Sequence, residues 1–136
     1  MNIDFIITHL SHGSPGSFFR PYEMAKRLSQ FQIDHSFYTP FEQDVKSYDD
    51  ISIKKIPGFP ENSTNKMYSI FRKLIYNSSL SRFVPYDSMV EKLSKKIVNG
   101  IERDQDSTDI FQGELIVGSL AAIKLAQKFN KKSIID

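Results

Sequence analysis

Two different spacings of hydrophobic residues alternate along this chain, and they predict strands and helices in turn. Short runs rich in apolar and β-branched residues, too brief for core helices, predict strands over residues 2–8, 33–39, 51–56, 108–113 and 133–136. Apolar residues three and four positions apart predict helices over residues 17–30, 67–75, 86–103 and 114–129. The first run is almost continuously apolar, which is typical of a strand buried on both faces of a parallel sheet.

The order of these elements predicts the fold class. Strands that are separated by helices form parallel sheets with right-handed crossovers, so we expect an α/β fold, a Rossmann-like three-layer sandwich with a mainly parallel sheet. The 136 residues are enough for one domain, spanning 1–136. The last predicted element is a strand, and a buried parallel strand normally leads into a covering helix. We therefore expect the chain to be part of a longer polypeptide, although a small doubly wound protein can also end on an edge strand.

The residue types within two helices predict how they pack. In the helix over 17–30 we expect Met24, Ala25 and Leu28 on the apolar face, with Ser17 as the N-cap and Pro21 in the first turn. The helix over 114–129 is rich in small residues, which permit close packing on a sheet. These residues are Gly118, Ser119, Ala121, Ala122 and Ala126.

Composition and charge exclude several classes of function. The net charge of +2 is too small to indicate nucleic-acid binding, and the absence of cysteine excludes disulfides, thiolate zinc sites and catalytic thiols. We expect no signal peptide, and the sequence contains no apolar run close to the roughly 20 residues that span a bilayer. We therefore expect a cytoplasmic protein. Lys95 and Lys96 indicate a solvated helix face, or alternatively a contact with anionic lipid headgroups that would make the protein membrane-associated.

The loop between the first strand and the first helix is the first candidate site. Such a loop lies at the carboxyl end of a parallel strand, where helix N-termini point unpaired N–H groups at anions. Gly13 and Gly16 do not form the three-glycine dinucleotide fingerprint, which argues against NAD binding, and no P-loop lysine follows them. The same glycines also have a simpler interpretation, in which they only form the turn from strand to helix.

Histidine and glutamate supply further candidates. His12 can donate a hydrogen bond to a ligand hydroxyl, whereas His9 and His12 have no third ligand near in sequence, which argues against a metal site. Gln112, Gly113 and Glu114 end the fourth strand. A glycine there lets a ligand approach closely, and Glu114 either is stabilised by the helix dipole alone or accepts hydrogen bonds from sugar hydroxyls.

Three stretches together resemble the N-terminal domain of GT-B glycosyltransferases, in particular the large retaining family that includes glycogen and sucrose synthases. The stretch from Ser14 to Leu28 resembles the glycine loop and first helix of that family. The stretch from Asp109 to Glu114, with the small-residue helix after it, is similar to the family's fourth strand and following helix. The last four residues, 133–136, resemble the next strand.

The resemblance implies one half of a GT-B fold, the acceptor-side domain of an enzyme that moves a sugar from a nucleotide sugar to an acceptor hydroxyl without a required metal. It implies a C-terminal donor-binding domain as partner, a sugar or glycan as acceptor, and no cofactor within this domain. Backbone N–H groups in the glycine loop would approach donor phosphates or acceptor, and His12 and Glu114 would orient acceptor hydroxyls. The implied substrate-binding residues are His12, Gly13, Ser14, Gly16, Ser17, Gln112, Gly113 and Glu114.

The chain departs from the family pattern at several points. Gln112 and Glu114 stand where the family has two histidines, and the loop glycines are separated rather than adjacent. The histidine that is often taken as catalytic in the family follows the strand that ends here at Asp136, so the resemblance implies no catalytic residue within these residues. We therefore expect that residues 1–136 alone fold but do not transfer sugar.

Two alternatives remain open at this point. One is a stand-alone α/β ligand-binding or regulatory domain of flavodoxin or receiver type, although the acid pair of receivers is missing and the serines of the first loop imitate a flavin phosphate loop poorly. The other is part of a sugar-nucleotide epimerase with the GT-B shape, which would also require a second half.

Overall fold

The centre of the computed structural model is a parallel sheet. The structure describes residues 1–8, 15–40, 51–59, 86–101 and 107–135. Within these ranges the sheet has five strands, in the order β3-β2-β1-β4-β5, and every neighbouring pair is parallel. The strands are β1 (Asn2–Ile6), β2 (Asp34–Thr39), β3 (Ile53–Lys55), β4 (Ile110–Gly113) and β5 (Lys132–Ile135). The predicted α/β class with a parallel sheet is confirmed.

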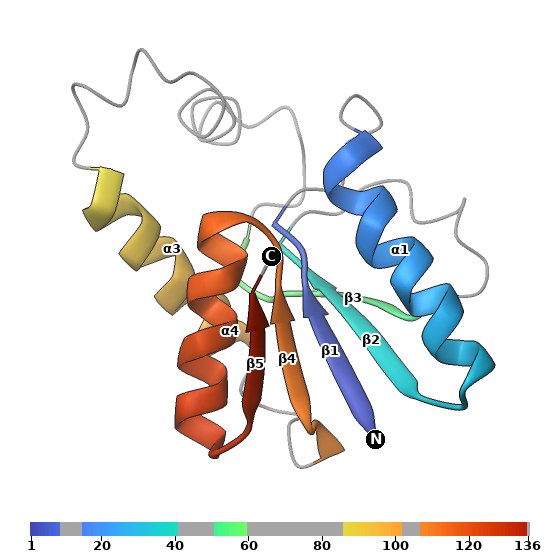
Figure 1. The fold of residues 1–136 in the computed structure, drawn as a ribbon. Helices are drawn as coiled ribbons and strands as arrows, with labels where there is room; N and C mark the ends of the chain where they lie inside the picture. Colours follow the sequence, from blue (N-terminus) through green and yellow to red (C-terminus); the bar gives the residue numbers. More distant parts are fainter. Residues whose placement is uncertain (9–14, 41–50, 60–85, 102–106, 136) are drawn as a thin grey trace.

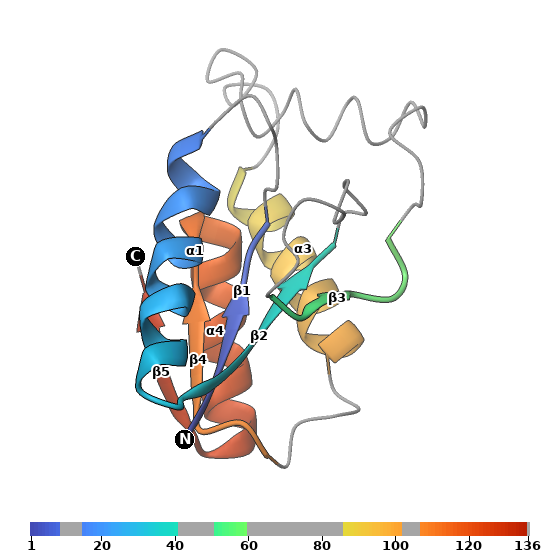
Figure 2. The ribbon, with the colours of Figure 1, turned by 90° about the vertical axis from the view of Figure 1, so that its right-hand side faces the viewer.

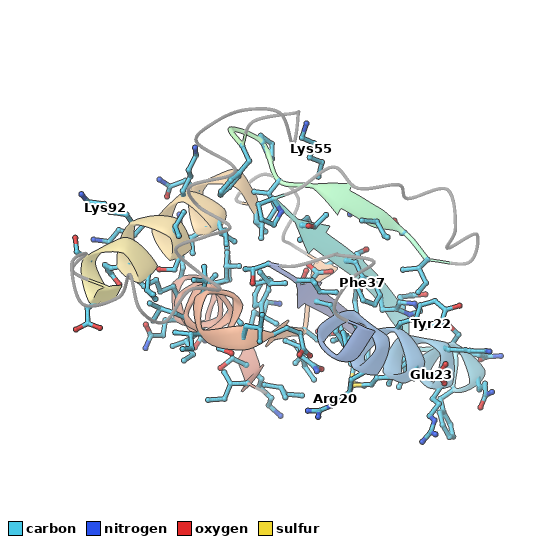
Figure 3. The ribbon with its side chains drawn as sticks, turned by 90° about the horizontal axis from the view of Figure 1, so that it is seen from above. Arg20, Tyr22, Glu23, Phe37, Lys55 and Lys92 are labelled. Carbon is cyan, nitrogen blue, oxygen red and sulfur yellow. The ribbon has the colours of Figure 1, made fainter. Side chains whose placement is uncertain are left out.

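The described helices cover both faces of the sheet. Helix α1 (Pro15–Gln30) lies on one face, and helices α3 (Tyr86–Ile101) and α4 (Leu115–Phe129) lie on the other. Figure 3 shows this arrangement from above, with Lys92 pointing outward from α3. The sheet therefore forms the middle of three layers, and the strands run toward the upper edge in Figure 1.

Alternating residues of the central strand divide the core into two clusters. Phe5 of β1 stacks on Phe37 of β2, with ring centroids 4.8 Å apart, and both pack beneath Ala25 of α1. Ile6, the next residue, faces the opposite side and packs with Phe111 among the apolar residues of α3 and α4. The period of two along a strand requires this division, because successive side chains point to opposite faces.

The strand order contains a switch point beside β1. The chain runs outward from β1 to β2 and β3, and then returns to place β4 on the other side of β1. Figure 2 shows the strands from the side, with α1 and α4 on opposite faces. This is the order of Rossmann-type halves, whereas flavodoxin-like and receiver folds have the order 2-1-3-4-5. Ligands of open α/β sheets bind at the carboxyl ends of the strands that flank such a point.

Several predicted boundaries differ from the structure. Helix α1 begins at Pro15 rather than at Ser17, so Ser17 is not the N-cap and Pro21 lies inside the helix. Met24 is exposed, because the buried face of α1 follows Pro21, Ala25 and Leu28, spaced four and three apart. The third strand is shorter than predicted, and the predicted helix over 67–75 lies outside the described residues.

A buried polar pair joins β1 to the segment before β4. Asp4 and Thr108 are both buried, and Thr108 Oγ1 donates a hydrogen bond of 2.6 Å to Asp4 Oδ2. Burial raises the pKa of the Asp4 carboxyl above its ordinary value, while the bond from Thr108 and the charge of Lys54 act in the opposite direction. The sequence analysis assigned no role to either residue.

Candidate functional site

The carboxyl ends of β1 and β4 meet at the switch point. The backbone N–H of Glu114 donates to the carbonyl oxygen of Ile6 at 3.1 Å, which holds the end of β4 against the end of β1. Thr8, just beyond β1, is buried. The candidate site is therefore built on two central strands rather than on a sheet edge.

Two glycines allow α4 to begin directly against this point. A Cβ atom added to Gly113 would lie 2.3 Å from the carbonyl oxygen of Gly118, and one added to Gly118 would lie 2.7 Å from the carbonyl oxygen of Ile6. Neither distance is sterically possible, so only glycine fits at both positions. The predicted close packing of the small-residue helix on the sheet is confirmed, and it carries the first turn of α4 to the end of β1.

The turn between β4 and α4 has an unusual backbone. Glu114 is the N-cap of α4 in extended conformation, and its side chain makes no capping hydrogen bond. Leu115, the first helical residue, has a φ of +60°. A left-handed conformation is costly for a bulky side chain, and strain of this kind concentrates at functional sites. The Leu115 side chain is exposed.

Gln112 and Glu114 form a buried polar pair at this turn. Their relative exposures are 1% and 5%, and Gln112 Nε2 donates to Glu114 Oε1 at 3.3 Å. This bond fixes the orientation of the amide, because the opposite orientation would place two oxygens against each other. Gln112 Oε1 is one of the few buried polar atoms in the described part of the chain that lack a hydrogen-bond partner. A buried oxygen without a donor is unusual and indicates a place where a ligand or water donates.

The pair selects for ligands that donate hydrogen bonds. An amide oxygen and a carboxylate are acceptors, and a carboxylate has about four lone-pair sites, so it accepts more than one bond. Glu114 also places its own negative charge at the N-terminus of α4, where a phosphate would otherwise be favoured. The arrangement therefore suits hydroxyl groups and disfavours anions at this helix.

The structure brings together only part of the predicted site. Gln112, Gly113 and Glu114 lie together at the switch point. Gly16 and Ser17 lie in the first turn of α1 rather than in a loop. The remaining predicted residues lie outside the described part of the chain. These are His12, Gly13 and Ser14.

Other candidate groups have structural partners. The His35 ring packs edge-on against Phe5 and Phe37, with centroids 6.5 and 6.1 Å apart. Lys95 pairs with Glu91 at 3.3 Å, and Lys96 Nζ lies 4.6 Å from the centroid of the Phe59 ring. The two lysines that suggested a lipid contact thus already interact within the chain.

Sequence reasoning missed three features of the site. Thr8 was read only as part of a strand. The left-handed backbone at Leu115 has no sequence signal, because leucine rarely adopts it. The exposure of Ile134 in β5 was not predicted either. A run of two isoleucines gives no information on whether a neighbouring helix covers them.

The described residues contain no group of three or more histidine, aspartate or glutamate side chains that could hold a metal ion. Among the described helices, none is both long and apolar enough to cross a membrane. Comparisons of the chain with protein-family models, with curated proteins and with solved structures found no match.

Proposed function

We propose that this chain is the acceptor-side half of a glycosyltransferase, and that it binds an acceptor hydroxyl at the carboxyl ends of β1 and β4. The observation that carries the proposal is the buried pair of Gln112 and Glu114, which presents acceptor oxygens at the switch point of a Rossmann-type sheet. The resemblance of residues 14–28 and 109–128 to GT-B enzymes supplies the reaction class.

The pair has a defined role in this proposal. A sugar hydroxyl that donates to Gln112 Oε1 supplies the donor that this buried oxygen lacks, and leaving such an oxygen unsatisfied costs about 1–3 kcal/mol. The Glu114 carboxylate accepts from a neighbouring hydroxyl, and a charged acceptor forms a stronger bond than a neutral one. Two fixed acceptors orient the sugar ring, so that its reacting hydroxyl faces the donor.

The rest of the enzyme follows from the same proposal. A second, donor-binding domain would hold the nucleotide sugar across a cleft from the switch point, and the reaction would proceed between the two domains, in the cytoplasm. The carboxylate at the N-terminus of α4 supports this division, because it disfavours donor phosphates there. The strand order gives no support to the flavodoxin or receiver alternative, and no observation favours the epimerase.

A binding experiment on the chain tests the proposal. Nuclear magnetic resonance spectra are recorded during titration with methyl glucoside, methyl mannoside and methyl galactoside, and separately with inorganic phosphate. We expect at least one glycoside to shift the side-chain amide signals of Gln112 and the backbone signals of Gly113 and Glu114, and phosphate to leave them unchanged. Phosphate shifts at these residues, or no shift with any glycoside, would contradict the proposal.

A pair of matched variants assigns the binding to the buried amide. Gln112→Met keeps the length of the side chain and removes both polar atoms, and we expect it to abolish glycoside binding. Gln127→Met makes the same change at an exposed position of α4 and is the control. Equal glycoside affinity in the two variants would show that the buried amide does not bind the sugar.

A further inference from the structure

The buried pair of Gln112 and Glu114 presents two acceptor groups within reach of a single ligand atom. Gln112 Nε2 lies 3.3 Å from Glu114 Oε1, to which it donates. The oxygen and nitrogen of an amide are about 2.2 Å apart, as its C=O and C–N bond lengths require. Gln112 Oε1 is therefore no more than roughly 5.5 Å from Glu114 Oε1. Two hydrogen bonds of about 2.9 Å each, made by one donor atom between the oxygens, span this distance.

The number of hydrogens on the donor atom decides which ligand group fits best. A hydroxyl carries one hydrogen, so it donates to one of the two oxygens and leaves the other without that donor. An ammonium group carries three donors and no acceptor, so it donates to both oxygens at once. Within the described residues Gln112 Oε1 has no hydrogen-bond partner, which favours a group with more than one donor.

The charge of the pair favours the same group. Glu114 is 5% exposed, and opposite charges attract more strongly in a poorly solvated place than in water. The N-terminus of α4 opposes this attraction, because the aligned peptide dipoles are equivalent to about +0.5 charge there. The full negative charge of the carboxylate is larger, so the local balance still favours a cation.

The low exposure of the pair favours a compact group. Gln112 is only 1% exposed, so a whole sugar ring has little room to lie against its amide. A primary ammonium is a single nitrogen atom that projects from the rest of its ligand. It reaches both oxygens while the ring that carries it stays outside the pair.

We propose that the group bound by this pair is a protonated primary amine, and that the acceptor is an amino sugar. The ammonium donates to Gln112 Oε1 and to the Glu114 carboxylate. A carboxylate has about four lone-pair sites, so it also accepts a bond from a hydroxyl beside the amine. A lysine side chain of a partner protein has the ammonium without this neighbouring hydroxyl. The inference rests on the proposed function and names its acceptor class.

The test compares glycosides that differ in one substituent, by nuclear magnetic resonance titration of the chain. Methyl glucoside carries hydroxyls only, whereas methyl glucosaminide and methyl 6-amino-6-deoxyglucoside each carry one amine, which is kept protonated. Dissociation constants come from the side-chain amide signals of Gln112 and the backbone signal of Glu114. We expect at least one amino glycoside to bind about tenfold more tightly than methyl glucoside, because hydrogen bonds to charged groups are stronger than neutral ones.

Two further probes separate charge from sugar. Methyl N-acetylglucosaminide keeps an N–H group but has no charge, and ethylammonium has the charge without a sugar. We expect both to bind more weakly than the better amino glycoside. An N-acetyl compound that binds as tightly would show that charge is not recognised. Ethylammonium bound as tightly would assign the pair to any ammonium group, such as a lysine side chain. Either result would overturn the inference.

Matched variants assign the preference for the amine to Glu114. Glu114→Gln removes the charge and keeps an acceptor oxygen, and we expect it to abolish the preference for the amino glycoside over methyl glucoside. Glu23→Gln makes the same change in α1 and is expected to leave the preference unchanged. Loss of the preference in both variants would show a response to the net charge of the chain and overturn the assignment. If Glu114→Gln does not fold, the comparison of probes on the parent chain decides.

The remaining outcomes separate the two proposals. Equal binding of methyl glucoside and both amino glycosides would overturn the amino-sugar acceptor and leave the hydroxyl site of the proposed function in place. Failure of every glycoside, with or without an amine, to shift the Gln112 signals would overturn the proposed function itself. The two oxygens would then be assigned to a bridging water.

Discussion

Thr108 Oγ1 donates a 2.6 Å hydrogen bond to the buried carboxyl of Asp4 and ties the segment before β4 to the central strand. The two residues are 104 positions apart, so the bond forms only when β1 and β4 are paired. It joins the middle of β1 to the segment before β4, whereas Gln112 and Glu114 lie at the carboxyl end of β4. The central pair of strands therefore carries two separate buried polar pairs, one of them at the carboxyl end.

The first prediction concerns the dependence of stability on pH. The pKa of Asp4 is raised by burial in the folded protein, so the folded state binds a proton more tightly than the unfolded chain. The contribution of Asp4 to stability is then largest below the unfolded pKa and declines as the pH rises through the folded pKa. We expect Asp4→Asn, which stays neutral at every pH, to remove this decline. Urea denaturation midpoints of both proteins across the acidic and neutral range measure it.

A different pH dependence of the Asp4→Asn variant would contradict this prediction. If the difference in midpoint between Asp4→Asn and the parent protein is the same at every pH, the carboxyl does not titrate between folded and unfolded states as the burial predicts. Thr108→Val is the companion variant, because it removes the donor that favours the charged carboxyl. We expect it to steepen the decline.

The second prediction concerns Gly113, which ends β4, and Gly118 of α4. Gly118→Ala places a methyl group against the carbonyl oxygen of Ile6, and Gly113→Ala places one against backbone atoms of Gly118 and Ser119. Overpacking of this kind costs about 1–3 kcal/mol, which exceeds the gain of about 1 kcal/mol from replacing a helical glycine by alanine. We expect both variants to lower the free energy of unfolding. Gln127→Ala, at an exposed position of the same helix, is the control and should change it little.

The third prediction concerns the strained backbone at Leu115. Glycine adopts a φ of +60° without a steric penalty, and the penalty for other residues is about 1–2 kcal/mol. We expect Leu115→Gly to stabilise the protein by about 1 kcal/mol, while Leu115→Ala, which retains Cβ, does not. Thermal unfolding of the three proteins measures the effect. A destabilised glycine variant would mean that contacts of the leucine side chain outweigh the strain.

The fourth prediction compares two ways in which α3 and α4 are held together. Leu125 of α4 is fully buried in the core cluster, whereas Lys124 bonds Glu91 of α3 at the surface. We expect Leu125→Ala to cost about 2–5 kcal/mol, the range for a leucine truncated in a packed core. Lys124→Met should have a much smaller effect, because exposed ion pairs contribute little. A Lys124 variant as damaging as the Leu125 variant would contradict this ranking.

The fold class could be predicted because the residue patterns that indicate strands and helices are local in the sequence. The continuous apolarity of β1 indicates burial on both faces, and both its neighbours in the sheet are indeed parallel strands. The start of α1 was predicted two residues late, because the prediction took Ser17 as a cap and Pro21 as a first-turn residue, whereas the helix contains both. Met24 was placed on the wrong face of α1. The position of the sheet determines which side of this helix is buried, and the sequence does not reveal where the sheet lies relative to the helix.

The candidate site was predictable only where its residues are neighbours in sequence. Gln112, Gly113 and Glu114 follow one another, so their position at a strand end was enough to group them. The bond between Thr108 and Asp4, the register of Ile134 with Gln112 and the positive φ of Leu115 arise from tertiary packing. The spacing of residues along the chain does not reveal such contacts. Leucine rarely adopts a left-handed backbone, so the residue type argues against the conformation seen at Leu115.

The contact between Gly118 and Ile6 has a consequence for how this site can change. Main-chain atoms meet directly there, so the position of residue 114 is set without the help of its own side chain. Substitutions at 112 and 114 therefore exchange the chemical groups offered to a ligand while the scaffold beneath them stays the same. These two positions can therefore determine ligand specificity. A small library of acidic, amide and basic residues at these positions would alter ligand preference while the backbone stays constant.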